Sequence, residues 1–171
     1  LSAAEGWGLS LTESLLTGTP FIANVTGGMQ DQMRFVDGKE EWYTNSKETP
    51  SNHKGTYTKH GEWVLPVYPK ALSLVGSPVT PYIWDDRCTA EDAAERISEL
   101  YSMGNEERKR RGDSGRQWAI GDEAGFTAEK MAKTFTSGME ELFVTWSPRE
   151  KFVFLKDTDF ETRVLKHKLN Y

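Results

Sequence analysis

Two glutamates near the start of the chain, Glu5 and Glu13, are separated by seven residues that include a Gly-Trp-Gly turn. Gly6 and Gly8 suit a tight backbone turn, and the leucine-rich segment that follows predicts a helix from about Gly8 to Thr17. At a rise of about 1.5 Å per helical residue, the two carboxylates lie on the order of 10 Å apart along the helix. They are therefore expected to contact different parts of one ligand.

The backbone between the two glutamates is suited to an anion. The first N–H groups of the predicted helix, near Trp7, Gly8 and Leu9, have no intrahelical acceptor, and they carry the positive end of the helix dipole. The resulting order is carboxylate, anion site, carboxylate. A nucleotide-sugar has the matching order of sugar hydroxyls, diphosphate and ribose diol. The stretch is suited to holding such a donor.

The elements that position these residues follow directly. Gly18 stands where a left-handed C-terminal cap would end the helix, and Pro20 prevents the helix from continuing. Residues 21–23, Phe-Ile-Ala, form a short apolar run that is typical of a buried strand in a parallel sheet. This order of loop, helix and strand predicts an α/β fold.

The same segment resembles a known family. Residues 2–20, SAAEGWGLSLTESLLTGTP, are similar to the Glu-x7-Glu signature of group-1 retaining glycosyltransferases, whose GT-B fold has two Rossmann-like domains. The resemblance implies that Glu5 contacts the donor sugar as the catalytic-site glutamate and that Glu13 binds the ribose. It places the backbone of Gly6, Trp7, Gly8 and Leu9 beside the sugar and diphosphate. It continues through Gly27-Gly28 and the helix expected after them, where Asp31 replaces the family's more frequent glutamate.

The resemblance implies a domain plan. Residues 1–143 would be the C-terminal part of a Rossmann-like donor domain, a parallel sheet flanked by helices, with a polar insertion at about 39–69 and a tail at 144–171. We expect the acceptor domain and the first half of the donor domain to precede Leu1, so the chain would be a fragment that does not turn over. An open strand edge and uncovered apolar faces predict a homo-oligomer.

Composition restricts the other partners. The net charge of −5 argues against nucleic acid, and no apolar run approaches the roughly 18 residues that span a bilayer. A single cysteine excludes an intrachain disulfide and fits a cytoplasmic protein, and the three histidines lack metal-ligand spacing. We therefore expect no metal and no cofactor, with the nucleotide-sugar as donor substrate and an unknown acceptor.

The remainder of the chain predicts further elements. Residues 72–76 are predicted to form a strand, and residues 78–86, which contain Pro78 and Pro81, are predicted to be irregular. Thr89 is predicted to be the N-cap of a helix that extends to about Met103. Asn105 would cap a second helix, whose basic run is interpreted as a solvated face. A third helix, starting at 125–127, carries an apolar stripe interpreted as core: Met131, Phe135, Met139, Leu142 and Phe143.

The same residues are also compatible with other functions. A nucleotide- or carbohydrate-binding module, or a structural remnant, would have the same loop and helix without catalysis. A glycoside hydrolase would need its two carboxylates to face one bond at about 5 to 9.5 Å, which a glutamate on a helix flank does not favour. The aromatic residues of the polar insertion suit either a lid over an acceptor or a surface loop packed on itself.

Overall fold

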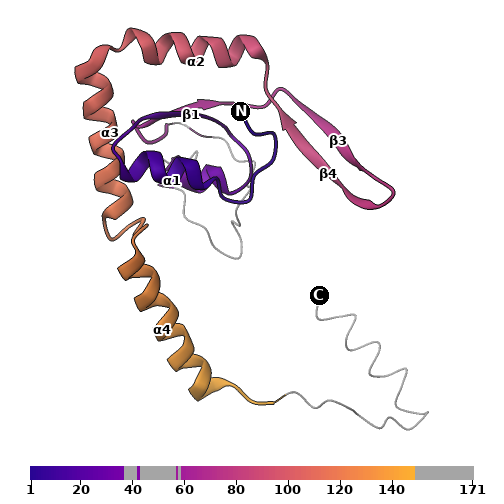
Figure 1. Cartoon of the computed structure of the whole chain (residues 1–171), viewed down its shortest axis with the longest axis vertical. Coiled ribbons are helices and arrows are strands. Elements are labelled where there is room, and N and C mark those ends of the chain that lie inside the picture. The colour runs from indigo at the N-terminus through magenta and orange to yellow at the C-terminus, as the bar shows by residue number, and fades with distance from the viewer. Residues whose placement is uncertain (37–41, 43–56, 58, 149–171) are drawn as a thin grey trace. The chain divides into compact units, whose positions relative to one another are not determined.

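The computed structural model describes residues 1–36, 42, 57 and 59–148, and it is a mixed α/β structure with a small parallel sheet and flanking helices (Figure 1). Contacts divide the chain into two units, Leu1–Met131 and Ala132–Tyr171. The elements in chain order are α1 (Leu9–Leu16), β1 (Phe21–Asn24), the 3-10 helix η1 (Gly27–Gln32), β2 (Val64–Val67), β3 (Ala71–Ser77), β4 (Thr80–Arg87), α2 (Ala90–Ser102), α3 (Gly104–Ile120) and α4 (Ala128–Thr145).

The parallel sheet forms the centre of the first unit. β1 pairs with β2 in parallel, with Phe21 opposite Val64 and Asn24 opposite Val67. The predicted strand at residues 21–23 is therefore confirmed. All four residues of β2 are buried, although they fall within the range 39–69 that was predicted to be a polar insertion. Much of that range lies outside the described residues, but its last part belongs to the core.

Helix α1 has the boundaries that its glycines predict. Gly8 precedes the helix with φ of 81°, and Gly18 follows it with φ of 70°. At the C-terminal end the amides of Gly18 and Thr19 donate to the carbonyls of Leu15 and Ser14, which is a Schellman motif. Leu11 and Leu15 are buried in the core, so the opposite side of the helix faces outward.

Small residues allow α3 to approach α1 closely. Gly112, Gly115 and Ala119 are buried on α3, at helical spacings of three and four. A Cβ atom at Gly112 would lie 1.8 Å from the carbonyl oxygen of Gly18, and one at Gly115 would lie 2.7 Å from Cβ of Trp63. The helix itself was predicted, but this contact face was not.

Residues 80–86 belong to β4 and only residues 78–79 form a turn, so the interpretation of the whole segment 78–86 as irregular is wrong. β3 and β4 form an antiparallel hairpin, which extends away from β1 in Figure 1. Pro81 is accommodated because the pairing is interrupted between Val75 and Ser77, where two residues of β4 oppose Gly76 alone. Gly76 has φ of 139°, which favours glycine at this bulge.

Helices α2 and α3 agree with the sequence in position, with one correction at a cap. The Thr89 hydroxyl accepts from the Asp92 amide at 3.1 Å, which confirms the predicted N-cap. Asn105 does not cap α3, which begins at Gly104, and its side-chain oxygen accepts from the Arg108 guanidinium. The basic run carries ion pairs with acidic neighbours, including Lys109 to Asp113 at 2.7 Å, as expected of a solvated face.

Helix α4 forms where the third helix was predicted, but its apolar stripe is not part of a core. Met131 and Phe135 are each 69% exposed, and Met139, Leu142 and Phe143 are exposed as well. The sequence pattern correctly indicates an amphipathic helix, but it does not indicate whether another element packs on the apolar face of that helix. No helix in the part of the chain that the structure describes combines the length and apolar character needed to cross a membrane.

Candidate functional site

The loop that carries Glu5 lies flat against the turn that follows β1. A Cβ atom at Gly27 would lie 1.9 Å from the carbonyl oxygen of Glu5, and one at Gly28 would lie 2.1 Å from that of Gly6. The Gly28 amide donates to the Glu5 carbonyl at 3.3 Å. Only glycine permits so close a backbone approach, which explains why two glycines follow β1.

A buried glutamine holds the next part of the loop. The Gln32 amide nitrogen donates to the carbonyls of Trp7 at 2.7 Å and Gly8 at 3.3 Å, and its oxygen accepts from the Thr12 hydroxyl at 2.8 Å. That hydroxyl in turn accepts from the Trp7 indole N–H at 2.9 Å. The Trp7 ring packs edge-on against Phe126 at 5.4 Å. The loop is thus fixed by η1 and by side-chain packing before any ligand binds.

The N-terminus of α1 has amides without acceptors among the described residues. Leu11 donates to the Gly8 carbonyl at 2.9 Å, whereas the N–H groups of Gly8 and Leu9 donate to no other described residue. In the part of the chain that the structure describes, no side chain caps this end of the helix. Unpaired N–H groups at the positive end of a helix favour an anion. Leu9 is exposed at this end, whereas Gly8 is buried against Met29.

A pocket of about 380 Å³ opens beside Glu5 at the carboxyl end of β1. It is lined by residues from three segments far apart in the sequence, among them Glu5, Gly6, Thr26, Gly27, Trp84 and Asp86. The carboxyl ends of parallel strands are the usual position of ligand sites in α/β folds. Glu5 is exposed, and neither it nor Glu13 enters an ion pair with another described residue.

Asp86 joins the hairpin to this pocket. It is 4% exposed, and its carboxylate accepts from the Thr26 hydroxyl at 2.6 Å. Its amide donates to the Ala3 carbonyl at 2.8 Å, and its carbonyl accepts from the Asn24 side chain at 3.1 Å. The end of β4, the end of β1 and the N-terminal segment are therefore tied together at the pocket.

The structure brings together only part of the predicted site. Glu5 and Gly6 line the pocket, while Leu9 and Glu13 lie exposed on α1 and do not line it. The Trp7 ring is used for packing, and Gly8 is buried against Met29.

Three further lining residues, Thr26, Trp84 and Asp86, were not predicted as site residues. The Trp84-Asp85-Asp86 run was a visible signal for two of them, but its interpretation as an irregular segment hid its position at a strand end.

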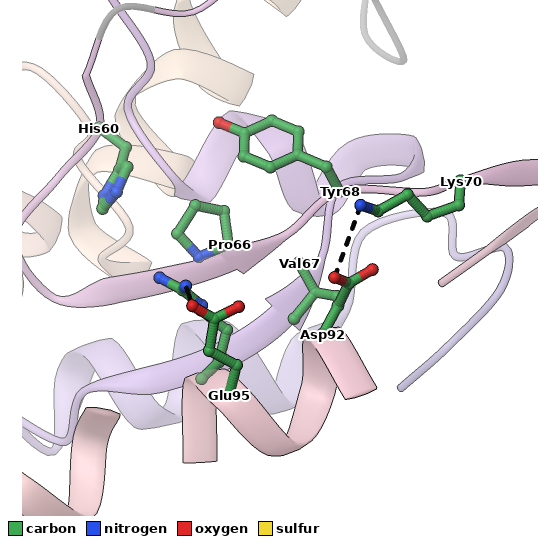
Figure 2. Close-up of a pocket in the computed structure, with 8 residues that line it drawn as sticks. His60, Pro66, Val67, Tyr68, Lys70, Asp92 and Glu95 are labelled. Carbon is green, nitrogen blue, oxygen red and sulfur yellow. Dashed lines mark ion pairs between the residues drawn. The ribbon is translucent and has the colours of Figure 1, made fainter. Parts of the chain in front are cut away.

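A second pocket, of about 340 Å³, lies between the end of β2 and the start of α2 (Figure 2). Its charged side chains largely neutralise one another: Lys70 pairs with Asp92 at 3.5 Å, and Glu95 pairs with Arg96 at 2.9 Å. Partial burial raises the pKa of the Tyr68 phenol, which keeps that group protonated at neutral pH. The carboxylates of this pocket are thus paired, whereas Glu5 in the first pocket forms no ion pair with another described residue.

The best-defined electrostatic cluster lies on α3, away from both pockets. Hydrogen bonds from Arg110 and then Arg111 lower the pKa of the Glu107 carboxyl to about 2. Among the described residues, no cluster of His, Cys, Asp and Glu side chains has the arrangement of a metal site.

No protein-family model, curated protein or solved structure matches the chain. The candidate site consists of an exposed carboxylate in a pocket, the uncapped amides at the N-terminus of α1, and a second exposed carboxylate further along α1.

Proposed function

We propose that the chain binds the nucleotide-diphosphate-sugar donor of a retaining glycosyltransferase and forms part of a Rossmann-like donor domain of GT-B type. The observation that carries the proposal is the order of groups along the loop before α1 and the helix itself. The exposed Glu5 lies before the uncapped amides of Gly8 and Leu9, and the exposed Glu13 follows them on α1.

Each group has a chemical role in this proposal. Glu5 accepts hydrogen bonds from sugar hydroxyls in the pocket, and Glu13 accepts them from the ribose diol. The amides of Gly8 and Leu9 bind the diphosphate. During transfer the bond between the anomeric carbon and the diphosphate oxygen breaks, and negative charge grows on the leaving phosphate. Amides fixed in advance by Gln32 and the Gly27-Gly28 contact stabilise that charge without reorganisation.

The expected affinity is low. The proposed site supplies the carboxylates of Glu5 and Glu13 and a few amides, and no basic residue among the described residues lines the pocket beside Glu5. A nucleoside diphosphate is therefore expected to bind at about millimolar Kd, near −4 kcal/mol. A nucleotide- or carbohydrate-binding module without transfer activity is the second candidate, and it is favoured by the same site because binding alone needs no further residue.

Isothermal titration calorimetry with uridine, guanosine and adenosine diphosphates, and with their hexose conjugates, tests the proposal. Glu13→Gln should weaken binding of all of them by about ten- to a hundredfold, because a charge-assisted bond contributes about 1.5 to 3 kcal/mol. Glu5→Gln should weaken the binding of the sugar conjugates and leave the binding of the free nucleoside diphosphates unchanged. Glu140→Gln, an exposed glutamate on α4, is the matched control. Equal binding by all four proteins would contradict the proposed site.

Transfer assays separate the two candidate functions. In an active enzyme that contains this chain, Glu5→Gln and Glu13→Gln should each reduce transfer by similar factors, whereas a binding module would show nucleotide affinity and no transfer. Release of sugar from a simple glycoside without any nucleotide would instead support a hydrolase.

A further inference from the structure

We propose that Trp84, on the β3–β4 hairpin, is a stacking platform that selects an uncharged sugar ring in the pocket beside Glu5. This inference rests on the proposed function, because it names the kind of sugar that the same pocket accepts. It adds a hairpin residue to a site that the sequence placed only in the first thirteen residues.

The position of Trp84 is fixed by the anchoring of Asp86. Successive side chains of a strand alternate between faces, so Trp84 and Asp86 share one face and lie about 7 Å apart along β4. Asp86 is buried and accepts from Thr26 at 2.6 Å. This bond holds the base of the hairpin against the end of β1, and it places the Trp84 ring at the wall of the pocket that Glu5 also lines.

Packing does not account for the Trp84 ring. It is 64% exposed, and the neighbours on its face, Leu74 and Tyr82, are more than half exposed as well. A pyranose has an apolar C–H face and a polar hydroxyl edge, so it fits a site in which a large aromatic surface lies next to a carboxylate. The C–H face of the sugar packs on the indole, and its hydroxyl edge donates to the carboxylate.

The charge of the pocket restricts which sugar binds. Its charged lining residues are Glu5 and Asp86, both acidic, and within the described part of the chain no lysine, arginine or histidine lines it. A carboxylate on the sugar would meet the exposed carboxylate of Glu5, which forms no ion pair with another described residue, and like-charge contacts oppose binding strongly. Neutral hexoses are therefore accepted and uronic acids are rejected.

The test uses the whole chain labelled with ¹⁵N at its six tryptophans, observed by NMR through the indole N–H signals. Methyl α-glucopyranoside and methyl α-galactopyranoside are titrated separately, and the methyl glycoside of glucuronic acid is titrated at the same ionic strength. We expect a saturable shift of the Trp84 signal with a neutral glycoside. The uronic acid should bind at least about tenfold more weakly.

Trp146 is the matched control, because it has the same exposed fraction of 64% and lies on the chain after α4. Trp84→Ala should weaken binding of the neutral glycoside by about tenfold or more, whereas Trp84→Tyr should retain most of the affinity. Trp146→Ala should change nothing. Equal shifts at Trp84 and Trp146, equal binding of the uronic acid, or full affinity in Trp84→Ala would each overturn the inference.

A nucleoside diphosphate titration on the same samples distinguishes this inference from the proposed function. Trp84→Ala should leave diphosphate affinity unchanged, since neither Gly8 nor Leu9 lines the pocket that Trp84 lines. Diphosphate binding without a sugar response at Trp84 would refute the platform and leave the donor site standing. Broadening of the Trp84 signal with protein concentration alone would identify the hairpin face as a self-association surface and would also refute it.

Discussion

Replacing Gly28 by alanine should separate the Glu5 loop from the turn that holds it. The new Cβ atom would lie 2.1 Å from the Gly6 carbonyl oxygen and 3.1 Å from the Gly6 carbonyl carbon. Both are backbone atoms, which cannot rotate away as a side chain would. The backbone on one side must therefore move by about 1 Å to restore an ordinary contact.

The magnitude follows from two costs. Overpacking a well-packed site costs about 1 to 3 kcal/mol. The displaced loop also weakens the bond from the Gly28 amide to the Glu5 carbonyl, a further contribution of about 1 kcal/mol. We expect the free energy of unfolding to fall by about 2 to 4 kcal/mol, which at an m-value near 2 kcal/mol/M shifts the urea midpoint by about 1 to 2 M.

Urea unfolding followed by tryptophan fluorescence measures this shift. Gly6→Ala is the control from the partner segment, because a Cβ atom there has no neighbour within 4 Å and its φ is not positive. It should leave the midpoint nearly unchanged. A Gly28→Ala midpoint equal to that of Gly6→Ala would refute the close approach of the two segments, and with it the support for the Glu5 loop.

Three other predictions concern the loop network, the α3 ion pairs and self-association. Gln32→Ala should lower the free energy of unfolding by about 2 to 4 kcal/mol, because it leaves buried hydrogen-bonding groups unpaired and opens a cavity. Chemical denaturation measures this change. A loss below about 0.5 kcal/mol would contradict the role of Gln32 in the loop network. The Glu107 carboxyl should titrate near pH 2 by NMR, so its contribution to stability is complete above about pH 4.5 and is lost as the pH falls toward 2. Arg110→Gln should raise the pKa of Glu107. An ordinary glutamate pKa in the unmodified protein would contradict the ion pairs. The exposed apolar side chains of the hairpin and of α4 should associate, and light scattering coupled to size exclusion should give a mass above 19.4 kDa; a monomer at about 50 µM protein would refute the expected oligomer.

The sequence predicted those elements for which propensity, capping and turn residues all indicate the same boundaries. α1 lies between two glycines with positive φ, and the Thr89 cap marks the start of α2. β1 is a short apolar run that ends beside a turn. In each case the information lies within a few residues, so propensity, capping and turn chemistry are sufficient.

Features that depend on distant contacts were missed. Pro81 suggested an irregular segment because the bulge that accommodates it requires Gly76 on the opposite strand. The buried face of α3 is built from glycine and alanine, which carry no hydropathy signal. β2 follows a polar stretch and contains Pro66, so its place beside β1 was not evident from its own residues.

The candidate site shows the same division. Glu5 and the α1 amides belong to one local motif and could be predicted together. Asp86 reaches the pocket through a bond to Thr26, a residue sixty positions earlier, and only the pairing of the hairpin brings Trp84 there. A reader of the sequence alone would place the site on one helix, whereas the structure divides it among three segments.

The most direct test of the donor site is an NMR titration of the ¹⁵N-labelled chain with nucleoside diphosphates, observed at the backbone amides. The proposed site predicts that the largest saturable shifts fall on Gly8 and Leu9, that Glu13 responds as well, and that the amides of α3 stay unchanged. Shifts confined to the basic face of α3, or no saturable shift at Gly8 and Leu9 at millimolar ligand, would contradict a diphosphate site at the N-terminus of α1.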